Sequence, residues 1–176
     1  MEHIVSFKTF TSIRQAMSYA KTLPKVGQGS SRRVFDLGNG FVVKVAKNRL
    51  GYIQNEYETI LSDDYYVQDL VNPVTEYSSK FLWVIAKKLK PVDFDTFFST
   101  LGDRQDLMDI IKSAGARTEC NIDFWDDTER PLIKELWDLV ANYDFDYYLD
   151  VTKRDSWGLT ESGQLKLVDY GLKKAI

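Results

Sequence analysis

The chain has 176 residues, of which 44% are hydrophobic and 14% aromatic, so it can bury a sizeable core and is not expected to be disordered. Its formal net charge is −3 without a block of basic residues, which argues against nucleic acid as a partner. The only cysteine, Cys120, excludes an internal disulfide bond, and the only histidine, His3, leaves too few ligands for a structural zinc site. The apolar runs are too short to span a bilayer and the N-terminus lacks the layout of a signal peptide, so we expect a cytoplasmic protein with no membrane partner.

The N-terminal part of the sequence predicts one helix followed by strands. In residues 12–23, apolar side chains recur with the spacing of one helical face, and Pro24 ends the pattern. Residues 33–37 and 41–46 have the character of strands, and the Gly-Asn-Gly sequence at residues 38–40 predicts the turn of a hairpin between them.

The remaining elements alternate between strands and helices. Residues 81–89 form the clearest strand, because their continuous apolar stretch suggests burial on both faces. The other predicted elements are helices at residues 55–61, 94–101, 106–114 and 131–143, strands at residues 65–70 and 74–77, a polar loop at residues 116–127, and a final hairpin of residues 158–159 and 165–168. The order is a strand-rich part, then helices, then a hairpin.

Two glycines and a lysine stand out in the strand-rich part. Gly27 and Gly29 form a Gly-x-Gly loop, which lacks Cβ atoms and so lets backbone N–H groups approach the phosphates of a ligand. A plain turn would explain two glycines equally well. Lys44 lies in the apolar strand that follows, where alternation places its side chain on the face opposite Val43 and Val45, toward either solvent or a cleft.

Asp169 ends the last apolar strand and is followed by Tyr170 and Gly171. A carboxylate at a strand end suits a Mg²⁺ ligand, and a glycine after it lets the chain turn. Taken alone, an Asp-Tyr-Gly sequence is also common in ordinary turns.

Together, these features resemble the protein-kinase-like fold. In this order, the segments that carry the resemblance to its glycine-rich loop, strand lysine and Asp-Phe-Gly element are residues 27–35, 41–46 and 165–171. The resemblance covers roughly residues 26–172 and is strongest to very short kinase-like proteins, such as those that phages encode. Two departures are Arg32, where the third loop glycine usually stands, and Tyr170 in place of Phe.

The resemblance implies an α+β fold of minimal protein-kinase-like type. A small antiparallel sheet lobe would occupy residues 1–89, and a reduced helical lobe would occupy residues 90–176. The cofactors would be ATP and Mg²⁺ in the cleft between the lobes. The implied nucleotide-binding residues are Gly27 and Gly29 through their amides, Val34 over the adenine, Lys44 on the phosphates, and the backbone from Ala86 to Lys88 on the adenine edge. Arg32 could touch a phosphate itself.

In the family, the strand lysine also pairs with a glutamate on a helix. Glu56 is the first candidate for this partner and Glu58 the second, because both lie on the short helix that follows Lys44. Without such a pairing, two glutamates on a helix are simply surface charge.

The catalytic loop departs further from the family pattern. Tyr148 and Asp150 fit its His-x-Asp element with Tyr for His, and Asp150 would orient the acceptor hydroxyl as a weak base. The expected asparagine is missing: Asp155 lies five residues after Asp150, whereas the interval counted back from Asp169 reaches Ser156. Asp169 with Asp155 or Ser156 would hold Mg²⁺, and the carboxylate is the stronger ligand of the two candidates. A solvated acidic loop is the alternative.

Three functions remain open. One is a kinase or small-molecule phosphotransferase with an unknown acceptor. Another is a pseudokinase that acts by binding a host or other partner protein, and the third is a structural protein that uses the fold. The sequence has five residues after Gly171, too few for the activation segment and later helices that dock protein substrates in the family. We therefore expect poor unaided transfer to generic protein substrates.

Overall fold

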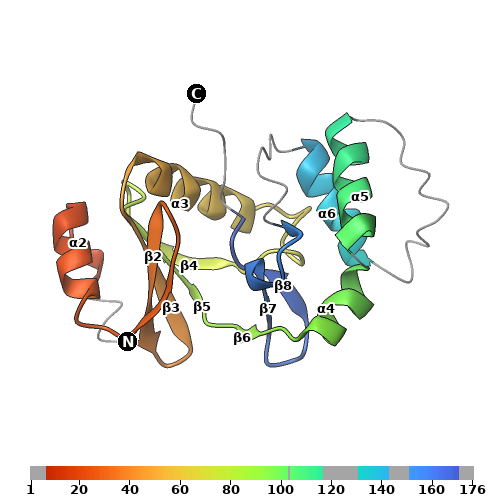
Figure 1. The fold of residues 1–176 in the computed structure, drawn as a ribbon. Coiled ribbons are helices and arrows are strands. Elements are labelled where there is room, and N and C mark those ends of the chain that lie inside the picture. Colours follow the sequence, from red (N-terminus) through yellow and green to blue (C-terminus); the bar gives the residue numbers. More distant parts are fainter. Residues whose placement is uncertain (1–6, 103, 117–130, 143–150, 171–176) are drawn as a thin grey trace. The chain divides into compact units, whose positions relative to one another are not determined.

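The computed structural model describes residues 7–102, 104–116, 131–142 and 151–170 (Figure 1). These residues fall into two compact units. Unit 1 contains residues 7–63 and 73–88, and unit 2 contains the rest of the described chain. Residues 64–72, which the sequence placed in the N-terminal lobe, thus group with the later part of the chain.

Unit 1 is built on a five-stranded antiparallel sheet with the strand order β1-β2-β3-β5-β4. Its strands are β1 (Lys25–Gln28), β2 (Arg32–Gly38), β3 (Phe41–Ala46), β4 (Val74–Tyr77) and β5 (Trp83–Lys87). The predicted hairpin between β2 and β3 is confirmed. It turns through Gly38, Asn39 and Gly40, which have φ angles of 75°, 52° and 79°, a region that glycine and asparagine enter more easily than other residues.

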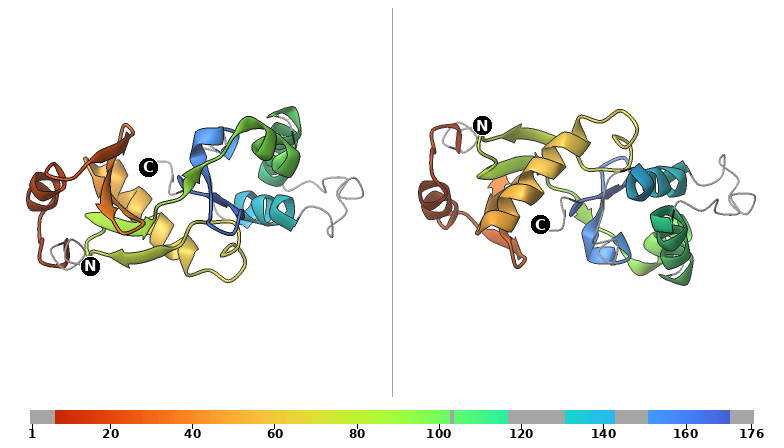
Figure 2. Two further views of the ribbon diagram at one scale, coloured as in Figure 1. Left: turned by 90° about the horizontal axis from the view of Figure 1, so that it is seen from below. Right: turned by 90° about the horizontal axis from the view of Figure 1, so that it is seen from above.

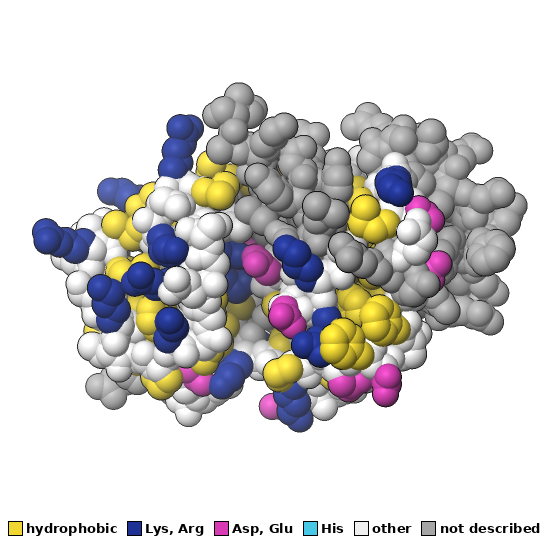
Figure 3. All heavy atoms as spheres, viewed as in Figure 1, with side chains coloured by type: hydrophobic (Ala, Val, Ile, Leu, Met, Phe, Trp, Pro, Cys, Tyr) yellow, Lys and Arg dark blue, Asp and Glu magenta, His cyan; other side chains and the backbone are white. Residues whose placement is uncertain are grey.

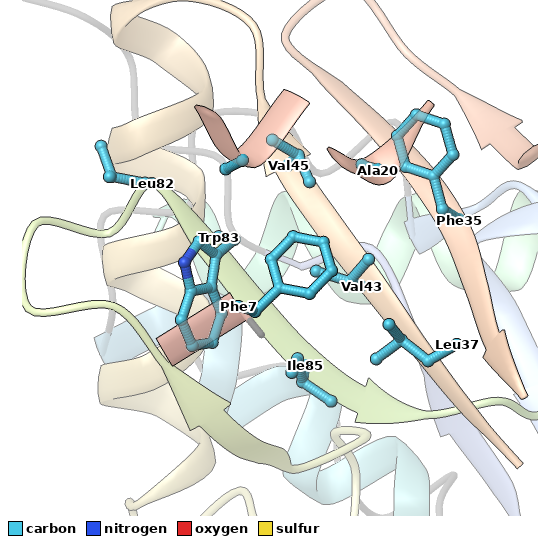
Figure 4. Packing of buried hydrophobic residues seen from close by; sticks show 10 residues of the cluster. Phe7, Ala20, Phe35, Leu37, Val43, Val45, Leu82, Trp83 and Ile85 are labelled. Carbon is cyan, nitrogen blue, oxygen red and sulfur yellow. The ribbon is translucent and has the colours of Figure 1, made fainter. Parts of the chain in front are cut away.

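One face of this sheet buries the hydrophobic cluster of unit 1 (Figure 4). Helix α2 (Ile13–Ala20) contributes Ala16 and Ala20 to it, and begins where the Ser12 hydroxyl accepts a hydrogen bond from the Gln15 N–H. The buried members are Phe7, Ala16, Ala20, Phe35, Leu37, Val43, Val45, Leu82, Trp83 and Ile85. The members on β2, β3 and β5 take alternate positions of these strands, so the intervening residues are left for the other face.

Helix α3 (Arg49–Ser62) packs against the sheet (Figure 2). Its Glu58 pairs with Lys44, a residue of that second face. The helix is longer than the predicted helix at residues 55–61. Its N-cap is Asn48, whose side-chain oxygen accepts a hydrogen bond from the Gly51 N–H at 3.1 Å. The buried residues of α3 are mostly polar or small, namely Gly51, Gln54, Asn55, Glu58, Thr59 and Leu61.

Unit 2 combines helices with a small antiparallel sheet of order β6-β7-β8. Its elements are β6 (Lys90–Pro91), α4 (Phe94–Leu101), α5 (Arg104–Ala116), α6 (Pro131–Asn142), the short 3₁₀ helix η2 (Arg154–Ser156), β7 (Trp157–Leu159) and β8 (Leu165–Leu167). The three predicted helices and the final hairpin are confirmed, with boundaries shifted by up to two residues. Helices α5 and α6 pack on each other, and Leu107 and Ile111 on α5 and Leu136 and Leu139 on α6 are fully buried.

The predicted strand at residues 65–70 is wrong. These residues form turns, in which the Asp64 carboxylate accepts a hydrogen bond from the Tyr66 N–H. The chain then runs alongside β8, with a parallel bridge between Val71 and Leu167. The described residues form a mixed α+β fold with antiparallel sheets, as expected. Within the described ranges, no helix combines the length and the apolar character needed to cross a membrane.

Candidate functional site

Lys44 lies in the middle of β3 on the face of the sheet away from the hydrophobic cluster. It stands directly opposite Val34 on β2 and Val84 on β5. Its side chain is 7% exposed. Of the two orientations open from the sequence, solvated or directed inward, the structure therefore shows the inward one.

The carboxylate of Glu58 joins Lys44 to Arg32. Lys44 Nζ lies 2.7 Å from Glu58 Oε2, and Arg32 Nη2 lies 2.7 Å from Glu58 Oε1. Glu58 is fully buried, and the side chains of Arg32 and Lys44 are 6% and 7% exposed. Ion pairs in such a dry environment are much less screened than surface pairs, so breaking this one is costly.

The partner of Lys44 is Glu58, and the first candidate, Glu56, is exposed. The reason is the face of α3 that meets the sheet. Gln54, Asn55 and Glu58 occupy one side of the helix at spacings of three and four residues, whereas Glu56 falls on the opposite side.

A second set of contacts ties Arg32 to the β4–β5 turn. Arg32 Nη1 donates to Asn55 Oδ1 at 3.3 Å, and Asn55 Nδ2 donates to the backbone oxygen of Phe81 at 2.8 Å. Phe81 has a φ angle of 52°, which is uncommon for a residue with a side chain. The Asn55 amide thus links the cation of β2 to a strained turn.

The glycine loop is held by a residue just before α3 and by one in the second turn of that helix. Lys47 Nζ donates to the Gly29 oxygen at 2.9 Å, and the Ser31 hydroxyl hydrogen-bonds Gln54 Oε1. A Cβ at Gly51 would collide with the Ser31 carbonyl oxygen and lie 2.9 Å from the Cα of Ala46, so only glycine fits there. Sequence analysis could not single out Gly51, because its close approach to Ser31 brings together residues 20 positions apart in the chain.

The two loop glycines differ in what surrounds them. The Gly29 N–H donates to the Arg32 oxygen at 3.0 Å, so in this conformation that amide is already used. A Cβ at Gly29 would have no described atom within 4 Å, whereas one at Gly27 would touch the Val34 side chain at 3.5 Å. Among the described residues, none therefore fills the space over Gly29, where a ligand could lie.

The backbone at the end of β5 is partly used within the sheet. Ala86 is paired with Val42 on one side and Val74 on the other, and the Lys88 N–H donates to the Gly40 oxygen at 2.8 Å. Lys88 Nζ lies 2.6 Å from the Asp36 carboxylate, and this hydrogen bond holds the pKa of Asp36 below its ordinary value. The predicted adenine contacts at Ala86 and Lys88 would have to use backbone groups that these hydrogen bonds do not already occupy.

In unit 2, Ser156 rather than Asp155 lies beside the Asp169 segment. The Ser156 backbone oxygen accepts from the Val168 N–H at 2.7 Å, and Ser156 is 7% exposed. The carboxylate of Asp155 is 88% exposed and lies 3.2 Å from Arg154. The structure thus brings Ser156 next to the residue that precedes Asp169, and leaves the Asp155 carboxylate in solvent.

Tyr170 is fully buried, and its hydroxyl donates to the Asn72 oxygen at 2.7 Å. The tyrosine therefore packs in the core as a phenylalanine would, and its extra hydroxyl has a partner. Asp150, Tyr148 and Gly171 lie outside the described residues. Across the described part of the chain, no three His, Cys, Asp or Glu side chains gather as a metal site.

A group of charges that the sequence did not indicate lies elsewhere in unit 2. Lys166 on β8 is 8% exposed and donates from Nζ to the Gln68 oxygen at 3.0 Å. Burial lowers the pKa of Lys166, against the attraction of Asp69 and Glu135. Burial and the charge of Asp69 raise the pKa of Glu135, and its Oε2 is buried without a hydrogen-bond partner among the described residues. On α6, the adjacent Lys134 lowers the pKa of Glu135, and Asp138, one turn further along, raises it.

No protein-family model matches the chain, and no curated protein matches it. Among solved structures, the chain is similar to SAICAR synthase from Saccharomyces cerevisiae in complex with SAICAR, with 12% sequence identity, a TM-score of 0.37, and coverage of 84% of this chain and 73% of the synthase chain. At that TM-score the likeness carries no argument about the activity of this chain.

Proposed function

We propose that this chain binds a nucleoside triphosphate, Mg·ATP, through the sheet face of unit 1. The observation that carries the proposal is the buried Lys44–Glu58 ion pair on the strand that follows the glycine loop. A buried ammonium held by a carboxylate is costly to maintain, and a role in binding a polyanion gives a reason for it. The Lys44 ammonium would contact the phosphates, with Glu58 fixing its position.

A metal ion bound with the nucleotide would need oxygen ligands from the chain. In this proposal the Asp169 carboxylate is the main Mg²⁺ ligand, and the Ser156 hydroxyl or a second carboxylate completes its protein ligands, because Mg²⁺ prefers oxygen donors and keeps several waters. Bound Mg²⁺ would neutralise charge on the phosphates. Asp150 would orient an acceptor hydroxyl if phosphate is transferred.

Binding without transfer is the second candidate function. Two observations favour it: the Gly29 amide is closed onto Arg32, and the exposed Asp155 carboxylate is not held near the Asp169 segment by any described contact. In that case the chain would act as a pseudokinase that binds a partner protein, and nucleotide would only stabilise it.

The test is a thermal unfolding titration with Mg·ATP on the wild type and on Lys44→Met. A ligand that binds only the folded state at a hundredfold excess over its Kd stabilises by about 2.7 kcal/mol, which raises the Tm of a chain of this size by roughly 5–10 °C. Lys44→Met, which keeps the apolar stem and removes the ammonium, should lose most of this shift.

Lys80→Met is the matched control, because Lys80 is an exposed lysine of the same unit. It should keep the wild-type shift. The proposal is wrong if wild type shows no shift at millimolar Mg·ATP, or if Lys44→Met shifts as much as Lys80→Met does. Release or transfer of labelled phosphate then separates the two candidate functions.

A further inference from the structure

Arg32 stands at the junction of the glycine loop and the Lys44 ion pair. Its backbone oxygen accepts from the Gly29 N–H at 3.0 Å, which closes the loop. Its guanidinium reaches α3, where it meets Glu58 and Asn55. One residue therefore connects the loop, the helix and, through Glu58, the strand lysine.

From this geometry we infer that Arg32 is a positioning residue that holds Glu58, and thereby the Lys44 ammonium, in the orientation that receives phosphate. The inference rests on the proposed function. It differs from the expectation that Arg32 touches a phosphate itself, since both of its terminal nitrogens donate inside unit 1 and its side chain is only 6% exposed.

The two oxygens of the Glu58 carboxylate bind different cations, which supports this role. Oε1 is bound to Arg32 and Oε2 to Lys44, each at 2.7 Å. Rotation of the carboxylate would break both contacts, so the arginine restricts the rotation that would release the lysine. Charge-assisted hydrogen bonds of this length are among the stronger ones in proteins.

The second anchor of Arg32 fixes the helix as well as the side chain. Asn55 and Glu58 are three residues apart on α3, so they lie on one side of it, and Arg32 binds both. The planar fork of a guanidinium can hold two acceptors at once, which a lysine cannot do with the same geometry. Helix α3 is thus held at two points against the first residue of β2.

The experiment compares Arg32→Gln, Arg32→Lys and Arg33→Gln in the full chain. Arg33 is the matched control: it is the neighbouring arginine, and its Nη1 lies near the sulfur of Met17 on α2 instead of near Glu58. Affinities for Mg·ATP and for adenosine are measured by calorimetry, and stability is measured by urea unfolding. Adenosine has no phosphate, so it reports on the rest of the site alone.

We expect Arg32→Gln to bind Mg·ATP about tenfold more weakly, which corresponds to about 1.4 kcal/mol, and to bind adenosine as wild type does. Arg32→Lys should show a smaller but selective loss, and Arg33→Gln should show none. If Arg32→Gln does not fold, Arg32→Lys decides: wild-type affinity for Mg·ATP overturns the inference, and a loss confined to Mg·ATP supports it.

Failure of the inference is distinguishable from failure of the proposed function. Equal losses for Mg·ATP and adenosine in Arg32→Gln would show a merely structural role, while nucleotide binding by wild type would stand. If wild type does not bind Mg·ATP, both the inference on Arg32 and the proposed function are wrong.

Discussion

Glu58 is the residue on which the polar contacts of unit 1 converge. It is fully buried and carries a negative charge that two cations balance. Removing one partner of a buried ion pair typically costs 3–5 kcal/mol, because the remaining charge stays buried. The two glutamates of α3 therefore provide a direct comparison.

We predict that Glu58→Gln lowers the free energy of unfolding by roughly 3–5 kcal/mol, since Arg32 and Lys44 lose their shared carboxylate. Glu56→Gln, on the exposed side of the same helix, should unfold close to wild type. Urea unfolding at pH 7 measures both. Equal effects of the two substitutions would contradict the assignment of Glu58 as the structural partner.

Glu135 makes a pH-dependent prediction. The folded-state pKa of Glu135 is raised, so ionising this carboxyl lowers the free energy of unfolding. The loss begins when the pH rises above the ordinary carboxyl pKa and is complete above the raised pKa. Glu135→Gln removes that cost. The variant should be more stable than wild type at pH 7, and its advantage should shrink as the pH falls through the raised pKa and vanish below the ordinary carboxyl pKa.

The measurement is urea unfolding of Glu135→Gln and of Glu161→Gln across this pH interval. Glu161 is exposed on the β7–β8 turn and serves as the control, with a stability difference that we expect to be small and flat with pH. A Glu135→Gln variant that is less stable at pH 7 than at acidic pH, relative to wild type, would show that Glu135 is charged and favourably paired.

At the scale of elements, Gly51 sets how closely α3 approaches the glycine loop. By helix propensity alone, Gly51→Ala would stabilise the helix by about 1 kcal/mol. The Cβ would instead meet the Ser31 carbonyl and the Ala46 backbone, and overpacking of this kind typically costs 1–3 kcal/mol. We therefore predict that Gly51→Ala is less stable than wild type and unfolds at a lower urea concentration.

Gly29→Ala is the matched control for this prediction. Gly29 has no described atom within 4 Å of an added Cβ, and its φ angle is not among the positive ones. Its stability should change little. A stabilised Gly51→Ala variant would mean that propensity outweighs the close approach and that α3 can move away from the loop.

The sequence predicted those elements that bury apolar side chains at regular spacing. Helix α4 and the β2–β3 hairpin came out close to their observed bounds for this reason. The first half of α3 did not, because its buried positions are Gly51, Gln54 and Asn55, which leave no apolar periodicity. The strand predicted at residues 65–70 is absent because Val67 and Leu70 are buried within turns, without strand pairing.

The candidate site was predictable only in part for a similar reason. Strand alternation identified Lys44 as a candidate but left its side chain facing either solvent or a cleft, and the choice between Glu56 and Glu58 depends on where α3 begins and which side meets the sheet. The role of Arg32 depends on a contact over 26 residues of sequence, and Ser156 on a backbone bond to Val168, neither of which has a local signal.

At the scale of the whole molecule, the net charge of −3 conceals an uneven distribution. Residues 1–63 and 73–88 carry 12 Lys and Arg against 6 Asp and Glu, a net charge of +6, whereas the remaining residues carry 11 against 20, a net charge of −9. In the view of Figure 3, Lys and Arg side chains are spread over the surface on the side where α2, β2 and β3 lie. A positive field around unit 1 favours the approach of anionic ligands and weakens with added salt.

The path of the chain between the two units has a consequence for its synthesis. Residues 64–72 belong to unit 2 although residues on both sides of them belong to unit 1. The Asn72 oxygen finds its partner, the Tyr170 hydroxyl, 98 residues later. A ribosome adds about 5–20 residues per second, so this segment waits roughly 5–20 s for β8 and Tyr170. During that interval Leu70 and Val71, which are buried in the folded protein, lack their backbone partner Leu167 on β8, and the nascent chain exposes a short apolar stretch to chaperones or to neighbouring chains.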